Sequence, residues 1–222
     1  MVQAKYQFRH CPQCQSMLIA NTFEYDCEQG IWAWSDGKLD ANVLPYLPGY
    51  GKCPECNHVF KRTSANRPNK PIKDTSGQVP CVLTPNAEDY RTAIDAAQSI
   101  GDVILEKQLR ITYWRHLNDA QRIGHRRPKP KVDKSWVLCQ AINMDALLDM
   151  LDVDDENEHL YKGEILRRLG KFDESLELLS TIKGRHQWLS GLIAMHAAAG
   201  YTHFFGMERV GDKWIPVSCS KR

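Results

Sequence analysis

The sequence predicts an α+β fold with a small β-rich N-terminal domain, an antiparallel α-helical bundle and a C-terminal β-hairpin. Two Cys-x-x-Cys pairs near the N-terminus are each followed by a short apolar run, as expected for strands beside a metal-binding turn. After residue 80, apolar residues recur with the helical period, and two apolar runs around Gly211-Asp212 indicate a final hairpin. We therefore expect domains at residues 1–80, 81–200 and 201–222.

The two cysteine pairs form a set suited to one tetrahedral ion. Two residues between cysteines let both thiolates reach an ion from a single turn. Four protein ligands leave no position for water or substrate, so we expect a structural Zn²⁺ site. Asn57 tolerates the positive φ that such a turn often needs, whereas Gln15 fits less well, and His58 is a candidate substitute ligand. The predicted ligands are Cys11, Cys14, Cys53 and Cys56.

The loop between the pairs, residues 15–52, is 38 residues long. A compact ribbon has roughly 15–20 residues there, so an insertion is present. Residues 23–26 and 31–34 flank Cys27-Glu28-Gln29-Gly30 as a predicted hairpin, and Ser35-Asp36-Gly37-Lys38 marks a second turn. Cys27 is interpreted as a packed or surface cysteine, with a reactive thiol as the alternative. Polar, proline-containing residues 61–80 are interpreted as a linker.

The rest of the chain is predicted to be mainly helical. Asn86 is a candidate N-cap for the first helix, and Gly170 and Gly184 lie in short turns that predict antiparallel helix pairs. The expected helices span residues 87–100, 103–123, 136–151, 158–169, 172–182 and 185–199.

Residues 159–179 resemble a tetratricopeptide repeat (TPR). Gly163 stands where that family needs close helix contact, Gly170 opens its turn, and residues 172–175 match the start of its second helix. His159 departs from the aromatic residue at the head of the first helix, and no proline closes the unit at Gln187. Because only one unit matches and a repeat fold needs roughly three, the resemblance implies a degenerate, TPR-like helical bundle.

The whole arrangement, with Trp-Ser-Asp-Gly-Lys at residues 34–38 of the insertion, is also similar to uncharacterised bacterial proteins. Those proteins pair an N-terminal zinc ribbon with such a bundle. The resemblance implies an architecture and no activity.

Composition excludes some classes of function. Among 222 residues, 42% are hydrophobic and the formal net charge is +2, which by itself predicts neither nucleic-acid nor membrane binding. No apolar run approaches the ~18–20 residues of a membrane span. Residues 1–6 lack the apolar region of a signal peptide, so we expect a reducing cytoplasm. No protease, hydrolase, phosphate-loop or dinucleotide motif appears, and we expect no enzyme.

Two charge clusters remain. The acidic residues from Asp145 to Glu158 either complement the dipole of the fourth helix or form a contact surface for a basic partner or for the chain's own basic loop. The basic loop at residues 122–134 is either a solvated connection between helices or a phosphate-binding surface. Its candidate nucleic-acid contacts are Arg122, Arg126, Arg127, Lys129 and Lys131.

The sequence favours a protein-interaction adaptor that binds a protein or peptide partner in a groove between helical hairpins. Trp32 and Trp34 are candidate exposed anchors, and otherwise at least one belongs to the core. Nucleic-acid binding through the ribbon and the basic loop is the alternative. An enzyme would need a catalytic constellation assembled only in space.

Overall fold

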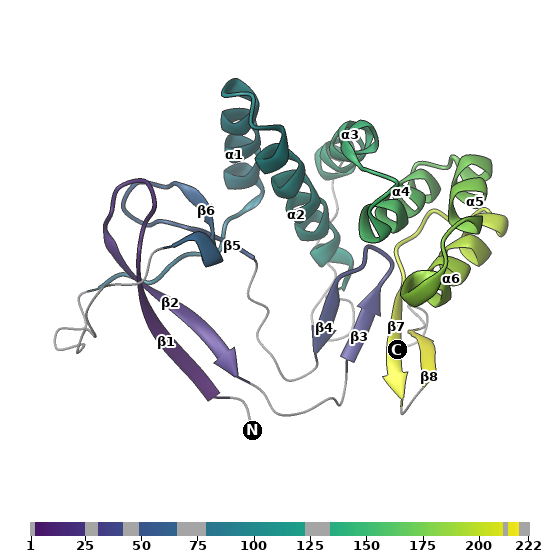
Figure 1. Cartoon of the computed structure of the whole chain (residues 1–222), viewed down its shortest axis with the longest axis horizontal. Helices are drawn as coiled ribbons and strands as arrows, with labels where there is room; N and C mark the ends of the chain where they lie inside the picture. Colours follow the sequence, from purple (N-terminus) through teal and green to yellow (C-terminus); the bar gives the residue numbers. More distant parts are fainter. Residues whose placement is uncertain are drawn as a thin grey trace. The chain divides into compact units, whose positions relative to one another are not determined.

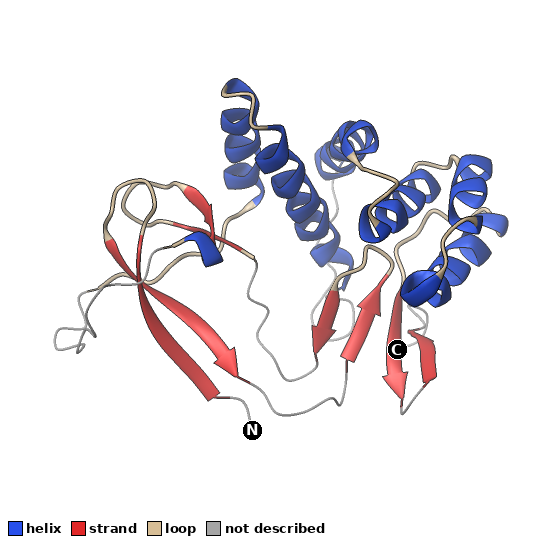
Figure 2. Cartoon of the chain, viewed as in Figure 1, coloured by secondary structure: helices blue, strands red, loops and turns tan. Residues whose placement is uncertain are grey.

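The computed structural model describes residues 3–24, 31–41, 49–65, 79–122, 134–210 and 213–217 (Figures 1 and 2). These residues form an α+β structure with short antiparallel strands, six α-helices and a C-terminal strand pair, as predicted. Residues 1–28 and 43–113 belong to one compact unit, here unit 1. Residues 29–42 and 114–222 belong to a second, unit 2, so the middle of the predicted N-terminal domain groups with the helices that follow it.

Unit 1 contains two hairpins that carry the cysteine pairs. Strand β1 (Gln3–His10) pairs antiparallel with β2 (Met17–Glu24), and β5 (Tyr50–Lys52) pairs with β6 (Val59–Lys61). The loop of each hairpin holds one Cys-x-x-Cys pair. The strands predicted after both pairs are therefore confirmed.

A short extended segment, residues 80–83, connects the two hairpins of unit 1. The Ile19 N–H donates to the Pro80 carbonyl at 2.9 Å, and Lys52 and Leu83 exchange two backbone hydrogen bonds of 3.0 Å. A Cβ atom at Gly51 would lie 2.3 Å from Val82 Cγ1, so only glycine fits this crossing. The end of the predicted linker is thus part of the β structure.

Helices α1 (Ala87–Ser99) and α2 (Val103–Arg122) follow this segment. The predicted N-cap is confirmed, because the Asn86 side chain accepts from the Asp89 N–H and the Asp89 carboxylate accepts from the Asn86 N–H. Lys52 Nζ of β5 lies 2.7 Å from Asp89 Oδ1, and the rings of Tyr90 and Tyr113 stack at 6.1 Å. These contacts attach α1 to α2 and to the two cysteine-bearing hairpins, β1–β2 and β5–β6, here called the ribbon.

Unit 2 contains a four-stranded antiparallel sheet in the order β4-β3-β7-β8. Its strands are β3 (Ile31–Trp34), β4 (Leu39–Ala41), β7 (Gly206–Val210) and β8 (Lys213–Val217). The predicted C-terminal hairpin is confirmed. The hairpin predicted between residues 23–26 and 31–34 is wrong, because β2 pairs with β1 while β3 pairs with β4 and β7. Gly37, at φ +73°, supplies the left-handed residue that turns β3 into β4.

Four helices complete unit 2: α3 (Lys134–Met150), α4 (Glu156–Arg168), α5 (Phe172–Ser180) and α6 (Gln187–Ala198). Helices α4, α5 and α6 lie side by side around one apolar cluster (Figure 1). Its buried members are Leu160, Leu179, Ile182, Leu189, Ile193 and Phe205. In the part of the chain that the structure describes, no helix combines the length and apolarity needed to cross a bilayer.

Two local predictions about these helices are confirmed. Gly170 ends α4 at φ +79°, and Gly163 lies where a Cβ atom would come within 2.5 Å of Leu179 Cδ2. The Ser175 hydroxyl donates to the Gly163 carbonyl at 2.8 Å across the same contact. The Asp155 carboxylate caps α4 by accepting two backbone N–H groups, which places part of the acidic cluster at this helix start.

We predict that Gly163→Ala lowers the free energy of unfolding by about 1–3 kcal/mol, because the new methyl group overpacks against Leu179. Urea denaturation of both proteins measures the difference. Gly191→Ala is the matched control, since no atom lies within 4 Å of that Cβ position in α6. A change in stability equal to that of Gly191→Ala would contradict the close packing of α4 on α5.

Candidate functional site

The two cysteine turns have the same backbone geometry. In each, the residue after the second cysteine lies at φ 60°: Asn57, as predicted, and also Gln15, which fitted that conformation less well. Matching hydrogen bonds close both turns. In the first turn, the Cys11 N–H donates to the Ser16 carbonyl at 3.0 Å and the Gln15 N–H donates to the Cys11 carbonyl at 3.0 Å. In the second turn, the Cys53 N–H donates to the His58 carbonyl at 2.9 Å and the Asn57 N–H donates to the Cys53 carbonyl at 3.0 Å.

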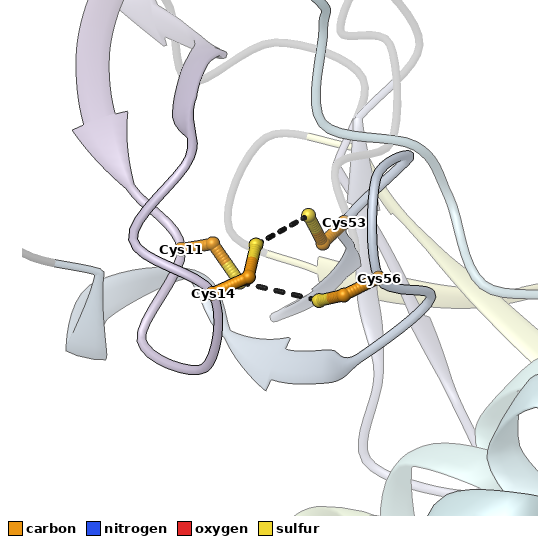
Figure 3. Close-up of side chains that lie close together, drawn as sticks. All are labelled: Cys11, Cys14, Cys53 and Cys56. Atoms are coloured by element: carbon orange, nitrogen blue, oxygen red, sulfur yellow. Dashed lines mark hydrogen bonds between the residues drawn. The ribbon is translucent and has the colours of Figure 1, made fainter.

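The four cysteine sulfurs converge on one centre (Figure 3). All four Sγ atoms lie within 4.8 Å of one another. The Sγ atoms of Cys11 and Cys56 are 3.7 Å apart, and those of Cys14 and Cys53 are 3.8 Å apart. Because a tetrahedral ion at ~2.3 Å from each sulfur separates its ligands by ~3.8 Å, the spacing fits an ion of that size.

The thiols of this cluster differ in how readily they lose a proton. The Ser16 hydroxyl lies 3.1 Å from Cys14 Sγ, and its hydrogen bond to the thiolate is the main reason that the pKa of Cys14 is lowered to about 6. Burial raises the pKa of Cys53 to about 12. Thiolates are the metal-binding form, so an entering cation must displace the Cys53 proton. The His58 ring stacks on Phe60, and the four sulfurs form the donor set.

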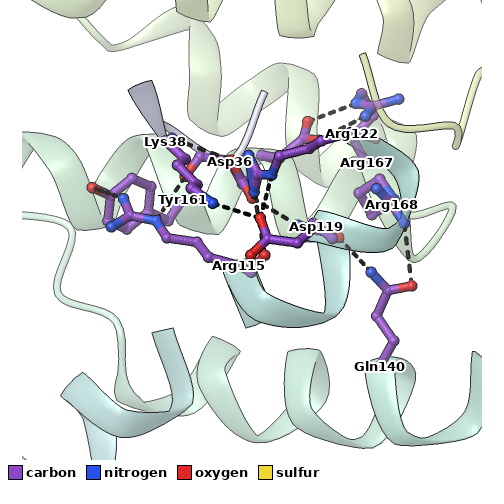
Figure 4. Close-up of polar contacts among 11 residues, drawn as sticks. Asp36, Lys38, Arg115, Asp119, Arg122, Gln140, Tyr161, Arg167 and Arg168 are labelled. Atoms are coloured by element: carbon purple, nitrogen blue, oxygen red, sulfur yellow. Dashed lines mark hydrogen bonds and ion pairs between the residues drawn. The ribbon is translucent and has the colours of Figure 1, made fainter. Parts of the chain in front are cut away.

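Unit 2 holds a second concentration of polar groups around the turn at residues 34–38 (Figure 4). The Asp36 carboxylate is fully buried and accepts four hydrogen bonds, which use all of its acceptor positions. The donors are the Lys38 N–H at 3.1 Å, Asn118 Nδ2 at 2.8 Å, Arg122 Nη1 at 3.1 Å and Arg122 Nη2. Such a bidentate Arg–carboxylate pair is strongly orienting.

Further polar side chains surround this pair. Asp119 accepts from Lys38 Nζ at 2.6 Å and from Arg122 Nε at 2.8 Å. Burial raises the pKa of Asp119, although both cations oppose that shift. Gln140 of α3 donates to Asn118 Oδ1 at 2.5 Å and accepts from Arg168 Nη2 at 3.3 Å. The turn therefore contacts α2 directly and is linked to α3 and α4 through Asn118 and Gln140.

Trp34 is a core residue, which corrects its assignment as an exposed anchor. Its side chain is 2% exposed and stacks on Phe204 at 5.3 Å. A Cβ atom at Gly206 would lie 2.6 Å from the indole ring, so β7 needs a glycine at the position where it contacts Trp34. The backbone of Trp32 pairs with Asp40 and Glu208, and its side chain is outside the part of the chain that the structure describes.

Arg122 is also corrected. It is 6% exposed, and its guanidinium is occupied by Asp36 and Asp119, so it is not available to a phosphate group. The reason is that α2 continues through Arg122 and places this residue inside unit 2. The other predicted nucleic-acid contacts, Arg126, Arg127, Lys129 and Lys131, lie outside the described residues, as does Cys27.

The buried polar cluster was missed as a site by the sequence interpretation. One signal for it is present in α2, where polar residues recur at the i, i+3, i+4, i+7 spacing of one helix face. These residues are Arg115, Asn118, Asp119 and Arg122. A face with this composition is usually solvated, and the buried Asp36 is what makes it internal here.

Comparison of the chain with protein-family models, with curated proteins and with solved structures gives no match. Functional inference therefore depends on the chemistry of the two clusters and on the exposed surface of the helices.

We predict that Asp36→Asn lowers the free energy of unfolding by about 3 kcal/mol, because it removes the buried carboxylate that pairs with both Nη atoms of Arg122 and leaves only Asp119 at Nε. Urea denaturation followed by tryptophan fluorescence measures the change. Asp149→Asn, on an exposed site of α3, is the matched control and should change stability by less than about 0.5 kcal/mol. Equal effects of the two substitutions would contradict the buried ion pair.

Proposed function

We propose that this chain is a non-enzymatic protein-interaction adaptor whose N-terminal ribbon is held by a structural Zn²⁺ ion. The convergence of all four Sγ atoms within 4.8 Å, with two of the six distances at 3.7 and 3.8 Å, carries the metal part of the proposal. Zinc is favoured because four thiolates in a tetrahedron suit its size and its preference for sulfur ligands. Four protein ligands complete the coordination shell, which is the arrangement of structural sites.

The interaction part is supported by apolar side chains exposed on α3. Leu138 is 60% exposed and Ile142, one turn later, is 58% exposed, with Val137 beside them. Asp145 and Asp149 continue the same helix side and are also exposed. A surface of this composition favours a partner segment that carries apolar residues followed by Lys or Arg.

A second group of apolar side chains includes exposed residues of α6 and the half-buried Trp214 of β8. The indole rings of Trp188 and Trp214 stack at 4.8 Å and 7°. Met195, two turns after Trp188, is exposed on α6. Large aromatic side chains in such positions commonly supply the binding energy of interfaces, so this group supports the same proposal.

We predict that Cys53→Ser abolishes zinc retention and unfolds the ribbon while most of the helical signal remains, because metal binding supplies the folding energy of such a domain. Metal analysis after gel filtration measures retention, and circular dichroism measures the helical signal. Cys81→Ser is the control, since this exposed cysteine is outside the four-sulfur cluster. Zinc retained equally by wild type and Cys53→Ser would refute the metal site.

We predict that Ile142→Lys removes most of the protein retained by the tagged chain in affinity capture from its native cells, because it places a charge in the apolar part of the α3 surface. Ser180→Lys, which adds the same charge at the exposed end of α5, should leave the retained proteins unchanged. Mass spectrometry with and without nuclease identifies them. Loss of all partners on nuclease treatment would instead favour the nucleic-acid alternative.

A further inference from the structure

We infer that metal binding at the four cysteines and folding of unit 2 stabilise each other, because the chain passes from one unit to the other within the loop that the metal closes. This inference rests on the proposed zinc centre and adds a thermodynamic coupling that a structural site alone does not imply. It is carried by the connectivity of the chain and by the buried anchoring of the turn at Asp36.

The first step is the position of β3 and β4 in the sequence. Cys14 and Cys53 end the segment 15–52, and an ion bound to both holds these ends together. Strands β3 and β4, residues 31–41, lie in the middle of that segment but belong to unit 2. The loop closed by the metal in unit 1 therefore contains the turn that carries the buried carboxylate of unit 2.

The second step is that α2 contributes adjacent residues to two cores. Tyr113 is buried in unit 1, where its ring stacks on Tyr90. Trp114 is fully buried in unit 2, where it meets Tyr161 edge-on at 6.1 Å. The segment 43–113 of unit 1 is preceded and followed in the chain by residues of unit 2. Once β4 and the end of α2 have joined unit 2, both ends of this segment are therefore fixed.

The third step is the entropy of closing that loop. Without metal, docking of the Asp36 turn must close a loop, residues 43–113, in which the cysteine-bearing hairpins are not held in place by an ion. With the ribbon ordered around a metal, much of this segment is already fixed, so docking costs less conformational entropy. By thermodynamic linkage, docking of the turn must raise the affinity of the cysteines for the metal by the same factor.

The turn couples the two processes because it packs against α2 in one buried arrangement. Asp36 is fully buried with four donors, and Trp34 beside it is 2% exposed. A partly docked turn would leave the Asp36 carboxylate or the Arg122 guanidinium buried without its partner, which is strongly unfavourable. Docking is therefore close to all-or-none, as an element that couples two equilibria must be.

The test measures zinc affinity in full-length variants of unit 2. The dissociation constant for Zn²⁺ alone is determined by competition with a chromophoric chelator for wild type, Asp36→Asn and the control Glu177→Gln, which neutralises an exposed carboxylate of α5. Neither substitution touches a cysteine ligand or the ribbon. The measurement is made at a urea concentration at which the turn is docked in wild type and undocked in Asp36→Asn, because the substitution changes zinc affinity only where it changes docking. We expect Asp36→Asn to weaken zinc binding roughly tenfold under these conditions and Glu177→Gln to leave it unchanged.

The reciprocal measurement is hydrogen exchange of α4 and α6 amides in the wild type with zinc bound and after chelation, and we expect faster exchange after chelation. Weakening of zinc binding by threefold or more in Asp36→Asn supports the coupling, and a smaller change overturns it. A wild type that binds no zinc overturns the metal centre itself and this inference with it. Zinc binding that is normal in wild type and equal in Asp36→Asn overturns only the coupling.

Discussion

Burial of the Asp36 carboxylate is the constraint on which the arrangement of unit 2 depends. A carboxylate removed from water is tolerated only when its charge and its lone pairs are matched. The matching groups are Asn118 and Arg122 of α2, which lie more than 80 residues after Asp36 in the sequence and donate to its carboxylate. Gln140 of α3 and Arg168 of α4 then satisfy the next groups outward. The polar residues thus join the turn to α2, α3 and α4 through one connected set of hydrogen bonds.

A second buried ion pair determines where the C-terminal strands enter the sheet. Arg167 and Glu164 of α4 are fully buried, and the Arg167 guanidinium also donates to the carbonyl groups of Tyr201 and His203, the latter at 3.0 Å. These bonds fix the segment that precedes β7. Phe204 then stacks on Trp34, and the Ser35 N–H donates to the Phe205 carbonyl at 3.0 Å. The register of β7 beside β3 follows from these contacts, since neither strand is long enough to specify it alone.

Local features of this fold were predictable from the sequence, and pairings between distant segments were not. The cysteine spacing predicted the clustered thiols, Asn86 predicted a helix start, and Gly163 predicted a close helix contact. Each of these depends on neighbouring residues and on a well-defined geometry. The pairing of β3 with β7 joins segments about 170 residues apart, and no local pattern encodes it. Trp34 and Arg122 were misassigned for the same reason, because amphipathic residues are usually exposed and become internal only when a distant partner covers them.

The two polar clusters lie in different units of the chain. Four converging thiols lie in a ribbon whose apolar cluster is small, and a buried hydrogen-bond network around Asp36 joins the turn to the helices of unit 2. In both clusters the polar groups contact one another. The exposed apolar residues of α3 and α6 stand on helices whose opposite faces are buried in the core. For the interaction that we propose, rigid presentation of these residues would lower the entropy lost on binding, which is the physical advantage of placing the polar clusters inside and the contact surface outside.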